Sequence, residues 1–391
     1  MTGTSLETHL QKPLLYKIRK VVRYVRLYGI GRTVMKVRGQ FHMRRNTSFE
    51  GDVWINSATM KDSSFVALVG CGNFPFCNTA YYLRKTARDF LRGAYDLLPE
   101  RARSLCSYFG GGYAAKRFDT ILKDDAVQLV YVASNHATHA DYAIAALDAG
   151  KHVHIEKPHV ISRDQLDRLI EAQKRNPDGM VFLGFNRPKS RLFKTLMSWL
   201  VREQGPVTIN WFVAGHKLPD DHWYYDDAEG SRIAGNVCHW TDLSLQMVGI
   251  DQAFPCEVRA SCPQGSKSDY AIAILFADGS VANITFSAKG ETFEGVREIL
   301  NLQRGDLIAT LDSFERLELS RGPVTKIIKP LFRDHGHRAN LVNSYEAVRD
   351  GDASRAVSLK YSVATARLFL ACHEALREGC PVVVDVLDVK G

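Results

Sequence analysis

The stretch VALVGCGNFPF (residues 66–76) decides the fold. Four apolar residues lead directly into Gly70-Cys71-Gly72, which is the pattern of a buried strand that feeds a glycine turn before a helix. Such a turn lets the backbone approach a dinucleotide pyrophosphate, which rests on the N-terminus of the helix. Pro75 stands where a third glycine usually lies. Proline is tolerated in a first helical turn, although it removes one possible donor to phosphate.

Strands and helices alternate on either side of this turn. Near-continuous apolar strands between helices indicate a parallel sheet covered on both faces, and right-handed crossovers then give a doubly wound domain over 64–188. We expect strands at 65–70, 90–96, 127–134, 152–158 and 180–185, and helices at 99–110, 139–150 and 163–176.

The pattern changes after about residue 190, where strands with one polar face predict an open, mostly antiparallel sheet with helices on its other side. We expect helices at 192–203 and within 340–378, and strands at 207–214, 257–262, 270–277, 281–288, 296–305 and 306–312. The predicted fold class is α/β, with a Rossmann domain followed by an α/β domain that carries a large open sheet. The predicted domains are 1–63, 64–188 and 189–391.

The composition predicts a globular protein of two domains without a membrane-spanning segment. A chain of 391 residues with 45% hydrophobic residues can bury the cores of two domains. Its longest apolar runs are far shorter than the roughly 20 residues that cross a bilayer, and its start lacks the apolar region of a secretion signal. The eight cysteines form no C-x-x-C pair. We therefore expect reduced thiols, a cytoplasmic location and no bound metal.

The basic charge belongs to the N-terminal segment. Residues 1–50 hold 11 Lys/Arg and 2 Asp/Glu, whereas the remainder holds 40 and 41. A helix is expected up to Gly29, followed by a second over 32–43, and one apolar stripe lies at helical spacing: Leu14, Ile18, Val21, Val22, Val25 and Tyr28. The stripe is expected to dock on the body of the protein; peripheral membrane contact through residues 12–45 is the alternative. Nucleic-acid binding is not expected, because no reading motif accompanies the charge.

An acidic residue indicates which dinucleotide is preferred. Asp96 lies 24 residues after Gly72, at the end of the second predicted strand. A carboxylate there accepts hydrogen bonds from a ribose 2′-hydroxyl and repels a 2′-phosphate. No arginine follows in 97–100, so the sequence favours NAD over NADP. The alternative is a domain that kept the fold and lost the cofactor.

Three segments, VGCGNF, YVASNHATHADYAIAALDAGKHVHIEKP and VFLGFNR, resemble the Gfo/Idh/MocA family of oxidoreductases. Two later segments, PDDHWYYDDAEGSRIAGNVCHWTDL and GHRANLVNSYEAVRDG, resemble the dehydrogenase half of two-domain oxidoreductases associated with surface-polysaccharide synthesis. The resemblance implies a tightly held NAD(P) and hydride exchange at a sugar, polyol or nucleotide-sugar carbon. It also implies a homo-oligomer, dimer or tetramer, often formed through the large sheet.

The resemblance carries over to individual residues of the first domain. Lys157 matches the lysine of the family's E-K-P motif, which hydrogen-bonds the reacting hydroxyl and handles its proton, and Pro158 is commonly preceded by a strained or cis linkage. The implied cofactor-binding residues are Gly70, Gly72, Asn73, Phe74, Asp96, Ser134, Asn135, His136, His139, Glu156 and Lys157. For His139, a capping or packing role is the alternative.

In the second domain, His239 is the candidate for substrate contact and proton transfer, because an imidazole titrates near neutral pH; a structural histidine is the alternative. The chain departs from the family at Gly235, where many members have an aspartate. Asp242 could orient His239 from the same helix face. The candidate substrate-binding residues are Asn186, Arg187, His222, Trp223, Asn236 and Asp242. His222 and Trp223 form either a sugar-stacking wall or a buried hairpin filler.

Two functions follow from these residues. Lys157 and His239 favour an NAD(P)-dependent dehydrogenase or reductase that acts on CH–OH groups. Pro75 and Gly235 motivate the alternative, a non-catalytic nucleotide-binding sensor or regulator with the same fold. The spacing of motifs does not determine the substrate or the reaction direction, because both depend on the shape of the second-domain pocket.

Overall fold

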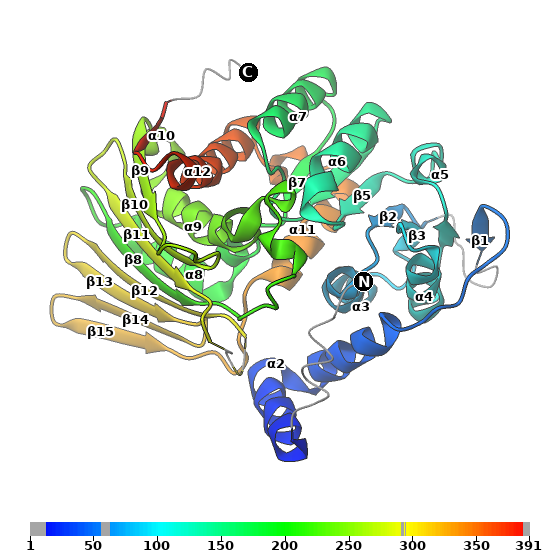
Figure 1. The fold of residues 1–391 in the computed structure, drawn as a ribbon, viewed down its shortest axis with the longest axis horizontal. Helices are drawn as coiled ribbons and strands as arrows, with labels where there is room; N and C mark the ends of the chain where they lie inside the picture. Colours follow the sequence, from blue (N-terminus) through cyan, green and yellow to red (C-terminus); the bar gives the residue numbers. More distant parts are fainter. Residues whose placement is uncertain (1–12, 56–62, 291–292, 294, 386–391) are drawn as a thin grey trace. The chain divides into compact units, whose positions relative to one another are not determined.

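The structure is a computed structural model, and its described part forms two compact units, named here by their sheets (Figure 1). The structure describes residues 13–55, 63–290, 293 and 295–385. The parallel-sheet unit comprises the described residues of 34–185 and 337–362, and the open-sheet unit comprises those of 13–33, 186–336 and 363–385. The domain boundaries at 63/64 and 188/189 stay a prediction.

The described residues of the parallel-sheet unit form a seven-stranded sheet in the order β1-β4-β3-β2-β5-β6-β7. Its strands are β1 (Val53–Ile55), β2 (Val66–Val69), β3 (Leu91–Tyr95), β4 (Tyr113–Ala115), β5 (Leu129–Val132), β6 (His152–Ile155) and β7 (Val181–Leu183). All neighbours are parallel except β1, which pairs antiparallel with β4. The strand order reverses between β2 and β5, and ligands bind at the carboxyl ends of strands at such a switch point. The predicted doubly wound sheet is confirmed.

Helices of this unit include α3 (Tyr81–Thr86), α4 (Pro99–Phe109), α5 (Phe118–Leu122), α6 (His139–Asp148), α7 (Arg163–Arg175) and α11 (His337–Asp350). Helices α3 to α7 lie between successive strands of this sheet, and α11, from a later part of the chain, belongs to the same unit. Local chemistry sets several ends: Ser162 caps α7 by accepting a hydrogen bond from the Gln165 N–H, and Gly110 ends α4 with a φ of 71°. The predicted strand at 152–158 is shorter, since β6 ends at Ile155.

The described residues of the open-sheet unit form a nine-stranded sheet in the order β15-β14-β13-β12-β8-β11-β10-β9-β16. Its strands are β8 (Thr208–Ala214), β9 (Cys256–Ser261), β10 (Asp269–Leu275), β11 (Val281–Ser287), β12 (Arg297–Arg304), β13 (Leu307–Asp312), β14 (Arg316–Arg321), β15 (Val324–Ile328) and β16 (Val382–Val384). Every neighbouring pair is antiparallel except β8 and β11. The predicted, mostly antiparallel sheet is confirmed; β14, β15 and β16 were not expected.

Among the described residues, helices cover one face of the open sheet and leave the other uncovered. The helices are α8 (Arg191–Leu200), α9 (Cys238–Val248), α10 (Ile250–Ala253) and α12 (Leu359–Glu378) (Figure 1). Strand β8 alternates between buried residues such as Trp211 and exposed residues such as Phe212. This two-residue period places the core between the sheet and the helices.

A buried carboxylate organises the interior of the open-sheet unit. Glu298 on β12 accepts hydrogen bonds from Arg187 Nε (2.8 Å) and Trp240 Nε1 (2.8 Å), and its Oε1 lies 3.3 Å from His335 Nε2. Burial alone would raise the pKa of Glu298, but Arg187 and His335 lower it to about 2. Glu298 therefore stays charged and ties three segments of the chain together.

Helix α2 (Leu14–His42) corrects an expectation about the N-terminal stripe. Gly29, with φ 80° and ψ 167°, breaks it into two segments, as the two predicted helices require. Leu14, Ile18, Val21 and Val22 are exposed, so the expectation that the stripe docks on the protein is wrong for these four residues. Val25 and Tyr28, the other two residues of the stripe, are partly buried. The opposite side of the first segment is the buried one, where Leu27 lies. Among the described residues, no helix is both long and apolar enough to span a bilayer.

Replacing Glu298 by alanine should lower the free energy of unfolding by about 3–5 kcal/mol, because the buried guanidinium of Arg187 would lose its counter-ion. Urea denaturation of the purified chain measures this change. The control is Glu378→Ala, which removes an exposed ion pair with Arg377 (3.1 Å) and should change stability by less than about 0.5 kcal/mol. Equal effects of the two variants would contradict the role of Glu298.

Candidate functional site

The glycine turn after β2 lies against the end of β5. Gly70 has a φ of 83°, and a Cβ atom there would lie 2.5 Å from the Ala133 carbonyl oxygen, so only glycine fits. The backbone N–H of Gly70 donates to the Tyr95 carbonyl oxygen (2.9 Å). In contrast, a Cβ at Gly72 would meet no protein atom within 4 Å. One side of the turn is therefore packed, while the side at Gly72 is open to a ligand.

Asp96 joins this turn to the end of β3. Its buried carboxylate accepts hydrogen bonds from the Cys71 N–H at Oδ2 (2.7 Å) and from the Leu98 N–H at Oδ1 (2.8 Å). The spacing in the sequence predicted that Asp96 and the turn lie together, and the structure places them in contact. A carboxylate has further lone pairs, so the same group can still accept from a ribose hydroxyl.

The helix after the turn begins with a wide π-helical segment, η1 (Pro75–Ala80), which continues into α3. Pro75 stands in the first turn of η1, where its missing N–H has no intrahelical partner. Asn73 directs its side chain into the protein, because Oδ1 accepts from Cys77 Sγ (3.0 Å). Because the Asn73 side chain is turned inward, the backbone N–H groups of residues 72–74 are the groups left to donate to a phosphate.

The loop after β5 is ordered by a threonine that the sequence analysis missed. Thr138, at the end of the short 3-10 helix η2 (His136–Thr138), donates to Asn135 Oδ1 (2.9 Å), and its hydroxyl lies 2.8 Å from Ser134 Oγ. His136 is buried at the start of η2. An S-N-x-x-T pattern with side-chain hydrogen bonds back to the loop is the sequence signal for this arrangement.

His139 holds the E-K-P tripeptide beside this loop. Its Nδ1 lies 2.7 Å from the Pro158 carbonyl oxygen, and its Nε2 lies 3.1 Å from the Ser134 carbonyl oxygen. Burial lowers the pKa of His139. The peptide bond between Lys157 and Pro158 is cis, as the family resemblance implied. The ring therefore positions the loop that carries Lys157, and a direct contact between His139 and a cofactor stays a prediction.

Glu156 is buried next to a glycine that the sequence analysis did not single out. A Cβ at Gly184, which follows β7, would lie 2.6 Å from Glu156 Oε2. Gly184 therefore leaves room for the carboxylate at the carboxyl end of β6. The turn, Asp96, the β5 loop and the E-K-P tripeptide all lie at the carboxyl edge of the parallel sheet, and together they suit a dinucleotide better than a mononucleotide.

The same part of the chain matches a family model. Residues 65–185 match GFO_IDH_MocA, described as "Oxidoreductase family, NAD-binding Rossmann fold". Residues 65–185 belong to the Gfo/Idh/MocA oxidoreductase family. An NAD-binding Rossmann domain is thereby established, whereas a choice between NAD and NADP is not.

Individual relatives resemble parts of the chain. Myo-inositol 2-dehydrogenase of Thermotoga maritima is 37% identical over 101 residues, which are 26% of this chain and 30% of that protein. Oxidoreductase P35 of Formosa agariphila is 26% identical over 109 residues, which are 28% of this chain and 34% of that protein. The chain thus spans about a third of the length of these curated relatives.

A solved structure shows the fold over a larger part of the chain. The structure of GenD2 from gentamicin A biosynthesis, in complex with NAD, has a TM-score of 0.71 and 22% identity, and covers 83% of this chain and 97% of its own. At this identity the likeness shows the fold alone and not the activity.

The open-sheet unit holds the other predicted residues. His239 and Asp242 are buried on α9, where Asp242 Oδ1 accepts from Thr365 Oγ1 of α12 (3.1 Å). Arg187 is engaged by Glu298, and Asn186 Nδ2 donates to the His335 carbonyl oxygen (2.6 Å). These bonds give Asn186, Arg187 and Asp242 structural partners, and substrate contact by them stays a prediction. Asn236 is partly buried in the π-helical segment η6 (Ile233–Val237).

Aromatic rings gather around the short helix η4 (Trp223–Tyr225). Trp223 stacks on Tyr224 with ring centroids 4.5 Å apart, and His222 stacks on Tyr224 at 5.5 Å. Trp223 is 40% exposed. A buried hairpin filler would be covered, so this exposure favours the sugar-stacking alternative.

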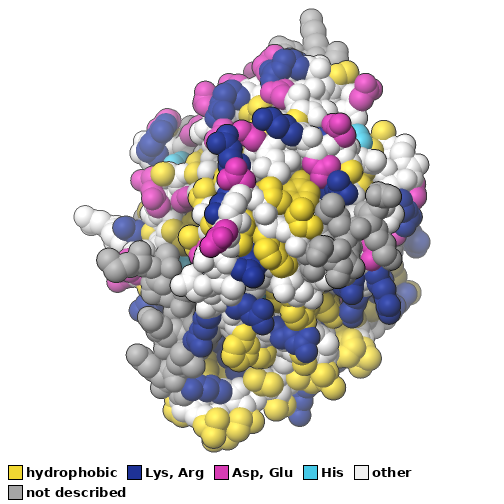
Figure 2. Space-filling view, turned by 90° about the vertical axis from the view of Figure 1, so that its right-hand side faces the viewer, with side chains coloured by type: hydrophobic (Ala, Val, Ile, Leu, Met, Phe, Trp, Pro, Cys, Tyr) yellow, Lys and Arg dark blue, Asp and Glu magenta, His cyan; other side chains and the backbone are white. Residues whose placement is uncertain are grey.

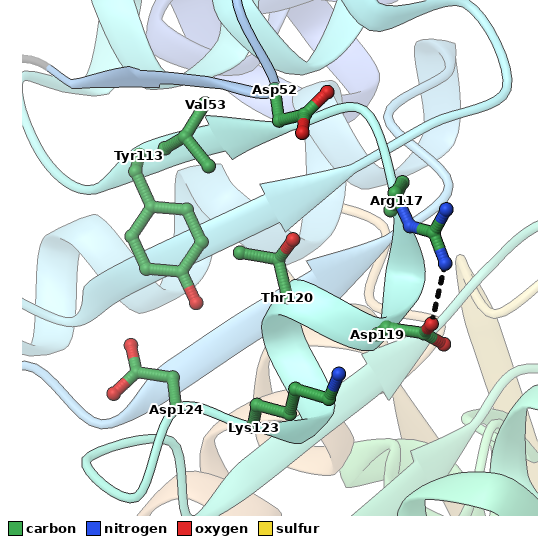
Figure 3. A pocket seen from close by; sticks show the side chains of 8 residues that line it. All are labelled: Asp52, Val53, Tyr113, Arg117, Asp119, Thr120, Lys123 and Asp124. Carbon is green, nitrogen blue, oxygen red and sulfur yellow. Dashed lines mark hydrogen bonds and ion pairs between the residues drawn. The ribbon is translucent and has the colours of Figure 1, made fainter.

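A surface pocket of the parallel-sheet unit contains none of the predicted site residues. It lies beside β1, β4 and α5, where Arg117 pairs with Asp119 (2.9 Å) (Figure 3). Tyr113 and Asp124 also line it, and burial raises the pKa of Tyr113. The dinucleotide site is defined instead by the glycine turn and its partners at the carboxyl edge of the sheet.

Gly72→Val should preserve the melting temperature and weaken NAD binding at least ten-fold. The Cβ of the valine would meet no protein atom within 4 Å, but the side chain would occupy the space beside the turn. Isothermal titration with NAD and a thermal melt measure the two effects. The matched control is Gly290→Val, because a Cβ at Gly290 also meets nothing within 4 Å. Unchanged NAD affinity in Gly72→Val would remove the turn from the cofactor site.

Proposed function

We propose that this chain is an NAD-dependent dehydrogenase or reductase that exchanges a hydride with a CH–OH carbon of a sugar, polyol or nucleotide sugar. The observation that carries the proposal is the buried His139 ring, which lies between the β5 loop and the Lys157-Pro158 segment with one nitrogen 2.7 Å from the Pro158 carbonyl oxygen and the other 3.1 Å from the Ser134 carbonyl oxygen. This arrangement holds a lysine at the same sheet edge as the dinucleotide turn. A pure nucleotide-binding protein has no need of an amine at that place.

Lys157 is the proposed proton-transfer group. A bound nicotinamide would supply the hydride acceptor or donor. The amine of Lys157 would hydrogen-bond the reacting hydroxyl and take its proton during oxidation, or return one during reduction. The buried ring of His139, 2.7 Å from the Pro158 carbonyl oxygen, would keep the tripeptide in place through the cycle.

The proposed cofactor is NAD rather than NADP. The Asp96 carboxylate is buried against the turn by two backbone hydrogen bonds, so its charge is fixed near the expected position of the adenosine ribose. A 2′-phosphate there would meet a negative charge without a compensating arginine in 97–100.

The substrate class is proposed from two sources. The Thermotoga maritima relative is named a myo-inositol dehydrogenase, and a levoglucosan dehydrogenase bound to NADH and L-sorbose shares the fold at a TM-score of 0.70 and 15% identity. In this chain, the stacked rings at His222 and Trp223 would suit a sugar face. His239 is the second proposed proton-transfer residue, and Gly235 in place of the usual aspartate indicates a substrate that differs from inositol.

A homo-oligomer is proposed through the uncovered face of the open sheet. Exposed apolar residues on that face include Phe212 and Ile308. The resemblance to oxidoreductases of polysaccharide synthesis supports a proposed role in sugar modification. The competing function is a nucleotide-binding sensor, for which no turnover would be seen with any sugar.

Lys157→Met should leave NAD affinity within about two-fold and lower kcat by 10²–10⁴-fold, since it removes the proton-transfer group and leaves the turn intact. Cofactor released from denatured protein is identified by mass spectrometry, and polyols and nucleotide sugars are then screened by absorbance of NADH at 340 nm. Lys174→Met, an exposed lysine on α7, is the control. Full activity of Lys157→Met would refute its role, and no turnover by the unmodified chain would favour the sensor.

Asp96→Asn should raise the affinity for NADP relative to NAD at least ten-fold. The amide oxygen can still accept one backbone hydrogen bond, whereas the charge that repels a 2′-phosphate is gone. Titration of both cofactors against both proteins gives the ratio. An unchanged ratio would show that Asp96 supports the turn without selecting the cofactor.

A further inference from the structure

Each segment of α2 presents an uncovered apolar stripe. In the first segment the stripe contains Leu14, Ile18, Val21 and Val22. In the second it contains Ile30, Val34, Val37 and Phe41, spaced by four, three and four residues, with Ile30 71% and Phe41 64% exposed. Contiguous exposed apolar surface of this kind marks an interaction site.

The opposite side of the helix is fixed, so the second segment cannot turn its stripe inward. The ring of His42 stacks on Phe76 with centroids 4.1 Å apart, and its nitrogens lie 2.6 Å from the Cys71 carbonyl oxygen and 2.9 Å from Ser104 Oγ. A Cβ at Gly39 would lie 2.3 Å from Cys77 Sγ, which shows how closely the backbone packs. The stripe therefore stays outside.

The first segment is held in the same manner within the open-sheet unit. Leu27 is buried, and its carbonyl oxygen accepts a hydrogen bond from the Arg333 N–H (2.8 Å). The ring of Phe332 would contact a Cβ on Gly29 at 3.4 Å, and Leu331 is 85% exposed next to it. These two residues extend the apolar surface beside the helix.

The charge on α2 itself has one sign. Residues 13–49 contain no Asp or Glu. Arg19, Arg26 and Lys36 are exposed on α2, and Arg44 and Arg45 are exposed just after it. Figure 2 shows basic side chains next to hydrophobic ones on the lower part of the face that it shows. A partner that binds the stripes of α2 must therefore be anionic and must also accommodate apolar side chains.

We propose that each segment of α2, the first together with Leu331 and Phe332, is a docking surface for an anionic lipid bilayer. Aliphatic side chains on a convex helix, flanked by arginines, fit a fluid headgroup layer, which needs no complementary pocket. A second copy would bring the same positive charge to the contact, and a nucleic acid would leave the aliphatic side chains in water. Binding is peripheral, since no described helix can span a bilayer.

The test uses the full chain and sedimentation with sucrose-loaded vesicles of phosphatidylcholine, with or without 30% phosphatidylglycerol. The chain should sediment with the anionic vesicles, should stay in solution with the neutral ones, and should be released at 0.5 M salt. The double variant Ile18→Glu/Val37→Glu should lose at least ten-fold in vesicle affinity. Both positions are exposed, so the variant should keep its melting temperature and its NAD affinity.

Val201→Glu is the matched control, because this aliphatic residue is 66% exposed at the end of α8 and lies outside the proposed surface. Vesicle binding by Val201→Glu as strong as that of the unmodified chain supports the proposal. The proposal is overturned if the unmodified chain ignores anionic vesicles, or if the double variant binds them equally. Two further results would assign the surface to another partner and overturn the proposal. One is an oligomer, seen by light scattering, that dissociates in the double variant. The other is a gel shift with RNA that the double variant abolishes.

Discussion

The hydrogen bond from the Cys71 N–H to the Asp96 carboxylate is the constraint on which the parallel-sheet unit depends. It fixes the loop after β2 to the end of β3, while Gly70 lets the same loop pass within contact of the β5 backbone. Three neighbouring strand ends are thereby held at one edge of the sheet. Because Gly72 remains open on the other side, the packing that stabilises the turn also creates the space for a dinucleotide.

The interior of the open-sheet unit is held together by a buried charged side chain that has several partners. Glu298 brings together Arg187, Trp240 and His335 from segments far apart in the chain. Burial opposes the charge of the carboxylate, and only the arginine and histidine beside it make the charged form stable. Asn186 and Arg187, which follow a strand, are predicted substrate-binding residues. In the structure, Arg187 stabilises the interior of this unit through its ion pair with Glu298.

Helix α2 has one packed side and one exposed side. His42 reaches the carbonyl oxygen of Cys71, the residue whose N–H is held by Asp96, so the N-terminal helix and the dinucleotide turn belong to one packed cluster. The same helix leaves its aliphatic stripes in solvent. A surface on which α2 rests would thus contact an element that is bonded directly to the cofactor turn.

The amino-acid sequence by itself determined five strands of the doubly wound sheet (β2, β3, β5, β6 and β7), the glycine turn, the acidic residue at the end of β3 and the family of residues 65–185, because all of these depend on local periodicity and short spacings. Only the tertiary structure decided which side chains meet: the Glu298 cluster, the link from Ser134 through His139 to Pro158, and the outward direction of the α2 stripes. The spacing of the stripe shows that α2 has an apolar face but not whether that face is covered. Covering depends on which side of the helix other segments occupy, and those contacts, such as His42 on Phe76, join residues far apart in the chain.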